Sequence, residues 1–213
     1  MQIEIITIYC LCVEYLAALG HRDDYQVSMT TAEVMTVALV AARFFKGCSE
    51  SSRQFLGEHG YMRQMLSKSR LNRRLHAIPE GVWLGLFALL AESVKRLNPD
   101  QEYVVDSLPV PVCDNIRIAR CRLYRDESFR GYIASKRRYF YGLRVHVLIT
   151  AHGVPVEFTL TPGAIADLTA FKTLPLDLPE HATIYADRAY NDYVLEDLLT
   201  NAGQIRSGRI RPG

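Results

Sequence analysis

Residues 103–112 read Tyr103-Val104-Val105-Asp106-Ser107-Leu108-Pro109-Val110-Pro111-Val112. Valine and tyrosine favour a pleated strand, and proline cannot donate to a central ladder, so the pattern predicts a short buried strand ending near Asp106–Leu108. An aspartate at the end of an apolar strand needs a reason, because a buried carboxylate without a partner is costly. Two reasons are open at this point: Asp106 caps the turn with a hydrogen bond, or it binds a metal at the edge of a sheet.

Composition allows one large or two small domains, because 213 residues can bury a sizeable core. The net charge of +2 hides a local asymmetry: nine Lys and Arg but only two acidic residues lie between Arg117 and Arg144. The five cysteines are an odd number without a C-x-x-C pair, so neither a disulfide framework nor a recognisable zinc site is expected.

The sequence predicts neither a leader nor a membrane span. The apolar N-terminus carries Glu4 and Glu14 and lacks a basic leader, so it makes a poor signal peptide. The longest apolar run, Val82–Ala91, has ten residues, too few to cross a bilayer. We therefore expect a soluble, cytoplasmic protein with no membrane partner.

The first 98 residues predict a bundle of helices. Apolar residues recur every three to four positions from Ile3 to Ala17, which is typical of an amphipathic helix. Thr30 and Glu33 have the spacing of a capping box and begin a second helix that Gly47 can end.

The rest of this half predicts three further helical stretches and a boundary. Short helices are expected around 51–56 and 61–66, and a last helix from about Pro79 to Leu97. Asn98-Pro99 ends that helix and is taken as the boundary between domains 1–98 and 99–213.

A basic helix is predicted between Ser67 and His76. Arg70, Arg73 and Arg74 share one face, while apolar residues share another. Two interpretations are open: a solvated face, or a helix that contacts DNA phosphates within a bundle of the helix-turn-helix kind.

The second half predicts strands around a basic loop, 113–136. Tyr139–Thr150 and Val154–Leu160 form a hairpin, Asp167 caps a short helix through Phe171, and Ala182–Ala186 is a further strand. A helix over 192–201 follows, and the terminal run 204–213 has no strand pattern.

Asp106 and Asp187 each follow a short apolar strand. In a mixed sheet with those two strands adjacent, the two carboxylates lie side by side. Mg²⁺ prefers carboxylate oxygens, and metal ions stabilise the attacking and leaving oxygens of phosphoryl transfer. The predicted fold class is therefore α+β or α/β, with a helical bundle followed by a mixed-sheet domain.

Several stretches resemble the DDE transposases of bacterial insertion sequences, which have an RNase H-like core, and most closely insertion-sequence family 982. The resemblance covers most of the chain and is carried by these motifs: Val105-Asp106-Ser107-Leu108-Pro109-Val110-Pro111-Val112-Cys113, Phe129-Arg130-Gly131-Tyr132, Ser135-Lys136-Arg137-Arg138-Tyr139-Phe140-Tyr141-Gly142, Val145-His146, Pro155-Val156-Glu157-Phe158, Leu160-Thr161-Pro162-Gly163, Tyr185-Ala186-Asp187, Ala189-Tyr190-Asn191-Asp192 and Ser69-Arg70-Leu71-Asn72-Arg73-Arg74-Leu75.

This resemblance implies an Mg²⁺-dependent (or Mn²⁺-dependent) DNA strand transferase. Asp106 and Asp187 match the first two catalytic, metal-binding acids. Double-stranded DNA is the implied partner, with a homodimer and association with the nucleoid as further expectations. The expected DNA contacts are Arg70, Arg73, Arg74, Arg117, Arg120, Arg130, Lys136, Arg137 and Arg138.

The family's third acid, a glutamate on a helix beyond a further strand, has no match here. Only 26 residues follow Asp187, and Glu196 and Asp197 lie on the wrong element. We therefore expect a core that lacks its C-terminal strand and helices, in a chain that is weakly active or inactive. The alternatives are a non-catalytic DNA-binding protein that occupies element ends or inhibits intact transposase, and a different nuclease of the same fold.

Overall fold

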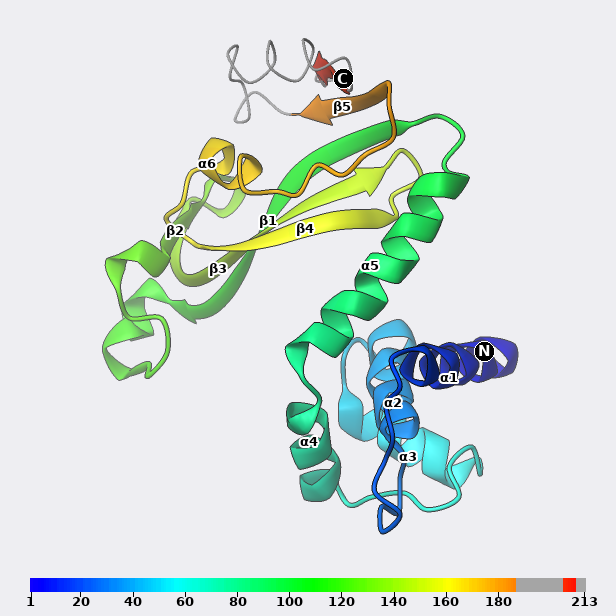
Figure 1. Cartoon of the computed structure of the whole chain (residues 1–213). Coiled ribbons are helices and arrows are strands. Elements are labelled where there is room, and N and C mark those ends of the chain that lie inside the picture. Colours follow the sequence, from blue (N-terminus) through cyan, green and yellow to red (C-terminus); the bar gives the residue numbers. More distant parts are fainter. Residues whose placement is uncertain (187–204, 210–213) are drawn as a thin grey trace. The chain divides into compact units, whose positions relative to one another are not determined.

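The computed structural model describes residues 1–186 and 205–209, which belong to two compact units, Met1–Leu86 and Phe87–Gly213 (Figure 1). Helices make up the first unit, and the second is built on a mixed sheet, so the predicted α+β class is confirmed. Helix α5, Glu80–Leu97, ends directly before Asn98-Pro99. The domain boundary at that dipeptide stays a prediction.

The helical unit contains α1 (Gln2–Ala18), α2 (Thr31–Phe44), α3 (Ser49–Glu58) and α4 (Lys68–Ala77). The predicted capping box is present: Thr30 accepts from the Glu33 amide, and the Glu33 carboxylate accepts from the Thr30 amide at 2.6 Å. Gly47 adopts φ 81° and donates its N–H to the Ala41 carbonyl, which ends α2 as expected.

The core of this unit forms where α2 packs against α1 and α3. Val34, Val37 and Val40 are fully buried, together with Leu56 of α3. The helix predicted over 61–66 is wrong, because those residues follow a bent path instead. Met62 and Leu66 are buried along that path, so burial in the core rather than helical periodicity explains their apolar spacing.

The second unit contains a six-stranded sheet. Its strands are β1 (Glu102–Asp114), β2 (Arg130–Ile133), β3 (Arg138–Thr150), β4 (Pro155–Pro162), β5 (Ala182–Ala186) and β6 (Ile205–Arg209), in the order β2-β3-β1-β5-β6 with β4 also on β3. β1 runs antiparallel to β3 and parallel to β5, and β6 runs parallel to β5. Helix α6, Asp167–Phe171, lies against the sheet (Figure 1).

Strand β1 is longer than predicted and continues through both prolines to Asp114. The pairing with β5 ends at Val105, whereas the pairing with β3 continues. The Gln101 carbonyl, directly before β1, accepts a hydrogen bond from the Thr183 N–H of β5. The backbone N–H and C=O groups of a strand point alternately to its two neighbours, so those of the odd-numbered residues of β1 point towards β5. Pro109 and Pro111 are odd-numbered, so the ladder with β3 loses no donor.

Two short strands were missed. β2 lies inside the basic loop predicted as an excursion, where it pairs with the first residues of β3. The expectation that 204–213 holds no strand is wrong for Ile205–Arg209, which pairs along the whole of β5. Strand β2 has only four residues, of which Gly131 and Ile133 are buried, so its alternation is too short to recognise in the sequence.

The sheet buries the side of β3 that carries His146 and Leu148, both at 0% exposure. Tyr103 and Val105 of β1 lie on the same buried side as Leu148. They belong to one hydrophobic cluster with Phe171, the last residue of α6. The opposite side of β1 is open to solvent at Leu108 and Val110.

Among the described residues, no single helix is long and apolar enough to cross a membrane. Helices α4 and α5, which are bent relative to each other by 74°, reach the length and hydropathy of a membrane span only when they are counted together.

Candidate functional site

Asp106 lies at the residue where β1 loses its neighbour β5. Val105 is opposite Ala186 in the parallel ladder, and Asp106 comes next on β1. Its side chain is exposed, and its Oδ1 atom accepts a hydrogen bond from the Ser107 backbone N–H at 2.7 Å. That amide faces the β5 side of β1, and the Asp106 carboxylate occupies this donor.

The predicted adjacency of the two aspartate-bearing strands is confirmed, because β1 and β5 pair directly. Asp187 itself lies outside the described residues. Ala186, the residue before it, is the last residue of β5. The role of Asp106 and Asp187 as catalytic acids stays a prediction.

A polar cluster lies on the opposite side of β1 from Asp106. The Ser107 hydroxyl donates to Asp167 Oδ1 at 3.0 Å, and Arg144 Nη1 donates to the same oxygen at 2.8 Å. His146 is paired with Ser107 across the β1–β3 ladder, and its Nδ1 atom is 3.8 Å from Asp167 Oδ1. His146 Nε2 lies 3.0 Å from the Thr161 hydroxyl oxygen.

Asp167 was predicted to cap α6, and the structure corrects this. The N-cap is Ala166, and no side chain makes a capping bond there. Asp167 is instead the first residue of α6, and its carboxylate joins the helix to β1 and β3. The signal available in the sequence was the polar pair Arg144 and His146, spaced two residues apart along one side of a strand.

Burial governs the protonation of His146. It lowers the pKa of His146, and although the Asp167 carboxylate opposes this shift, the net direction is downward. The imidazole is therefore disposed to be neutral near pH 7, as expected of a packing histidine.

The described residues supply carboxylate oxygens of the kind that Mg²⁺ prefers, but they contain no group of three acidic, histidine or cysteine side chains that could hold a metal. Asp106 is the exposed carboxylate at the strand end. Its fit to a divalent cation rests on this donor type and exposure.

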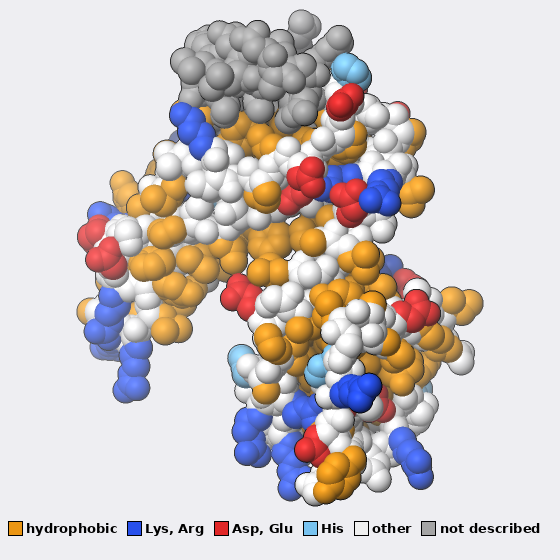
Figure 2. Space-filling model, viewed as in Figure 1, with side chains coloured by type: hydrophobic (Ala, Val, Ile, Leu, Met, Phe, Trp, Pro, Cys, Tyr) orange, Lys and Arg blue, Asp and Glu red, His pale blue; other side chains and the backbone are white. Residues whose placement is uncertain are grey.

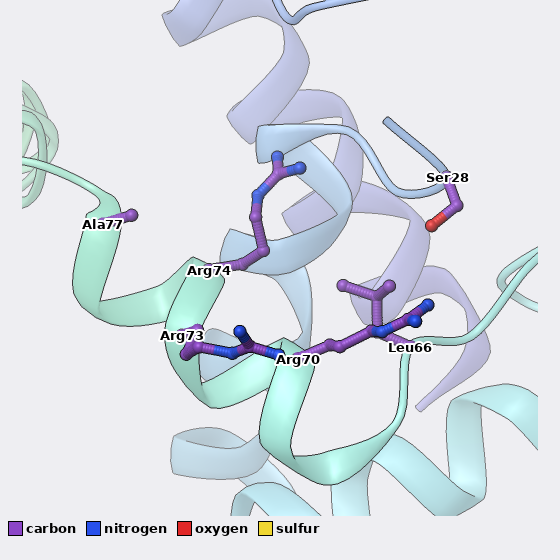
Figure 3. A pocket seen from close by; sticks show the side chains of 6 residues that line it. All are labelled: Ser28, Leu66, Arg70, Arg73, Arg74 and Ala77. Carbon is purple, nitrogen blue, oxygen red and sulfur yellow. The ribbon is translucent and has the colours of Figure 1, made fainter. Parts of the chain in front are cut away.

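The basic helix forms as predicted and lines a cavity of about 450 Å³ in the helical unit. The lining residues are Ser28, Leu66, Arg70, Arg73, Arg74 and Ala77 (Figure 3). Arg70 and Arg73 are exposed. Figure 3 shows the Arg74 side chain pointing away from those of Arg70 and Arg73.

Arg74 contacts two residues at the start of α2, Asp23 in the preceding loop and Thr31 in the first turn. Its Nη2 atom is 3.3 Å from Asp23 Oδ1 and 3.3 Å from the Thr31 hydroxyl oxygen. Asp23 also accepts from the Thr31 backbone N–H. Hydrogen bonding to Thr31 and the nearby charges of His21 and Arg74 together outweigh burial and lower the pKa of Asp23. Arg74 thus joins α4 to α2, while Arg70 and Arg73 present their charges to solvent.

The basic residues of the sheet unit gather around the loop between β1 and β2 and the turn before β3 (Figure 2). Arg117, Arg120, Lys136, Arg137 and Arg138 are exposed, and Arg137 takes a left-handed conformation with φ 49°. Arg130 is held instead: its guanidinium lies 4.3 Å from the centre of the Tyr139 ring and 3.5 Å from Glu127. Their contact with DNA stays a prediction.

Comparison with known proteins adds a family match. A family model described as a transposase DDE domain matches residues 97–207. No curated protein matches the chain. Among solved structures, a piggyBac transposase in a synaptic complex with hairpin DNA aligns with 97% of this chain at 12% identity and a TM-score of 0.43. The chain spans about half of that transposase, covering 49% of its length.

Proposed function

Because the chain belongs to the transposase DDE domain family, whose model matches just over half of it, we propose that it acts on DNA as a transposase. The reaction is hydrolysis of a phosphodiester at an element end, which frees a 3′-hydroxyl. This 3′-hydroxyl then attacks a phosphodiester of the target strand, which joins the element end to the target and releases the target's own 3′-hydroxyl. The finer assignment to insertion-sequence family 982 rests on the motifs around Asp106 and Asp187 and is part of the proposal.

The observation that carries the proposal is the register of β1 on β5 inside the matched segment. Val105 lies opposite Ala186, and an aspartate follows each of them in the sequence. Asp106 and Asp187 would hold Mg²⁺ or Mn²⁺, which activates the attacking oxygen and stabilises the leaving oxygen when bound. The chain's own contribution is to orient Asp106 at the strand end through the Ser107 amide.

Duplex DNA is the proposed partner. The exposed basic residues of the loop from Arg117 to Lys136 belong to the matched segment, and Arg70 and Arg73 belong to the helical unit. Such side chains bind phosphates, and neutralising phosphates makes DNA affinity dependent on salt. Homodimer formation and a place at the nucleoid are further parts of this proposal.

The test is a plasmid-nicking and strand-joining assay with the purified chain, with Mg²⁺, Mn²⁺ or no metal present. Nicking should need the metal, and Asp106→Asn should reduce it by about 100-fold or more. Glu180→Gln is the matched control, because Glu180 is an exposed carboxylate on the same unit. Nicking by Asp106→Asn at the wild-type rate would contradict the proposal.

A second candidate function is DNA binding without catalysis. The exposed Arg70 and Arg73 at a cavity outside the matched segment favour it. Gel-shift of duplex DNA without any nicked product would support this candidate. Metal-dependent cleavage without joining would instead indicate a nuclease of the same fold.

A further inference from the structure

Ser107 lies between two carboxylates and binds both. Its backbone N–H donates to Asp106 Oδ1 at 2.7 Å, and its hydroxyl donates to Asp167 Oδ1 at 3.0 Å. Successive side chains of a strand point to opposite sides, so the two carboxylates lie on opposite sides of β1. One residue therefore connects the exposed side of the strand end to the polar cluster behind it.

Asp167 is firmly held on its own side. Arg144 donates to it at 2.8 Å, and the two side chains are only 17% and 18% exposed. Arg144 also donates to the Tyr132 backbone carbonyl at 3.3 Å, which joins the pair to β2. A charge-assisted bond in such a half-buried place is stronger and more directional than an exposed one.

This arrangement keeps Asp167 from serving as a further ligand of a metal held by Asp106. Its Oδ1 atom already accepts from Arg144 and Ser107, and it faces away from the side that Asp106 occupies. A metal held by Asp106 would have to pass through the strand to reach it. Asp167 can therefore affect a metal at Asp106 only through another residue, and Ser107 is bonded to both.

We propose that Asp167 is a positioning residue for Asp106, acting through the hydroxyl and amide of Ser107. The inference rests on the proposed function of Asp106 as a metal-binding acid. In the described residues the ladder between β1 and β5 ends at Val105, and Ser107 lies two residues further along β1. The Ser107–Asp167 bond supplies a second restraint besides β3, and the oriented amide then sets the direction of the Asp106 carboxylate.

The experiment titrates the purified full chain with Mn²⁺ alone and follows binding by electron paramagnetic resonance, so that no catalysis is needed. Four variants are compared with the wild type: Asp106→Asn, Ser107→Ala, Ser107→Thr and Asp167→Ala. Thr173→Ala is the matched control, because its hydroxyl bonds to Ala170 at the end of α6 and has no link to Asp106. Thermal unfolding of each variant is measured in parallel.

The expected result is a loss of Mn²⁺ binding in Asp106→Asn and about ten-fold weaker binding in Ser107→Ala, the size typical of residues that orient a metal ligand. Ser107→Thr keeps the hydroxyl and should restore binding to near the wild-type affinity. Asp167→Ala should behave like Ser107→Ala. Thr173→Ala should bind Mn²⁺ as the wild type does, whatever its unfolding temperature.

The inference is overturned if Ser107→Ala binds Mn²⁺ as tightly as the wild type while Asp106→Asn does not. It is also overturned if Ser107→Thr binds as weakly as Ser107→Ala. If Asp167→Ala does not fold, the two Ser107 variants decide the question. Wild-type binding by Asp106→Asn would overturn the inference too, but would identify the proposed role of Asp106 as the part that failed.

Discussion

Val105 of β1 lies opposite Ala186 of β5 in a parallel ladder, although 80 residues separate them in the chain. Two residues far apart in sequence thereby become neighbours, each directly before an aspartate. Parallel strands place their carboxyl ends at the same edge of a sheet, where α/β proteins commonly bind ligands. The consequences of this edge and of the surfaces around it can be tested one at a time.

Loss of Arg70 and Arg73 should affect DNA affinity, whereas loss of Arg74 should affect the stability of the fold. Replacing the exposed pair with alanine should weaken duplex binding for all sequences and flatten the dependence of log affinity on log salt by roughly 0.9 per lost contact. Fluorescence anisotropy over a salt series measures this slope. Asn72→Ala, at an exposed neutral position on α4, is the control.

Arg74→Ala should instead lower the free energy of unfolding by about 1 kcal/mol, because Asp23 loses a charged hydrogen-bond partner. Denaturant unfolding measures this change. A salt slope that is unaltered in the Arg70 and Arg73 double variant, or a fully stable Arg74→Ala, would contradict the division of roles.

Gly142→Ala should destabilise the sheet unit. A Cβ atom at Gly142 would meet the Val110 carbonyl oxygen and would lie 2.9 Å from the Val112 nitrogen, both backbone atoms that cannot move aside. The expected loss of unfolding free energy is about 1–3 kcal/mol, as for other overpacked sites. Denaturant unfolding would show it as a shift of the midpoint.

Gly81→Ala in α5 is the control for this change, because a Cβ atom there meets nothing within 4 Å. Alanine is also the better helix former, by about 1 kcal/mol at most. Equal stability of the two alanine variants would show that β1 and β3 approach less closely at Gly142 than described.

Because of His146, the free energy of unfolding should fall as the pH is lowered below about 6.5, the ordinary pKa of a histidine. Burial lowers the pKa of His146 in the folded chain, so the unfolded chain binds the proton first as the pH falls. The stabilising contribution is complete above the unfolded pKa and is lost between that value and the lowered folded pKa. His146→Gln, which can still bond to Thr161, should show a flatter dependence.

Thermal unfolding between about pH 7 and pH 5.5 measures this difference across the ordinary histidine range. Asp167 and Arg144 face His146 and both remain in the variant. The same slope in the variant and the wild type would mean that His146 does not titrate below its ordinary pKa.

Lys95→Met should be the most destabilising of these changes. Lys95 is 6% exposed and donates to Glu157 at 3.1 Å and to the Asp177 carbonyl at 2.7 Å. Its removal leaves a half-buried carboxylate without this partner, a loss of about 3–5 kcal/mol for such pairs. Burial already raises the pKa of Glu157, so adding Glu157→Gln should recover part of the loss.

The neighbouring Arg96→Met provides the comparison. Arg96 is 77% exposed and pairs with Glu92 in solvent, so its loss should change stability by no more than about 0.5 kcal/mol. Denaturant unfolding of both variants would distinguish a buried ion pair from an exposed one. Similar losses would contradict the role of Lys95.

The features predicted correctly from the sequence are those that local chemistry decides. Thr30 and Glu33 meet within one turn of helix, and the hairpin of β3 and β4 needs only its turn and alternation. The signals of the capping box and the hairpin lie within a few residues of the structure that they predict. The adjacency of β1 and β5 was instead a premise of the metal-site hypothesis, and the observed pairing confirms it.

The errors occurred where a distant partner decides. Pro109 would end β1 only if neighbouring strands paired with β1 on both sides at that residue. The described pairing with β5 ends at Val105 and Ala186, before Pro109 is reached. Asp167 looked like a cap because its partners Ser107 and Arg144 lie 60 and 23 residues away in the sequence. The catalytic assignment of Asp187 falls on a residue outside the described part.

The two prolines of β1 also bear on how copies of this protein meet. On the β5 side beyond Val105, Pro109 and Pro111 have no N–H to offer, and the amide of Ser107 is occupied by Asp106. A strand from another molecule would find carbonyl oxygens there but almost no donors with which to pair. Edge-to-edge recruitment and the fibrous aggregation that follows from it are thus disfavoured along this stretch.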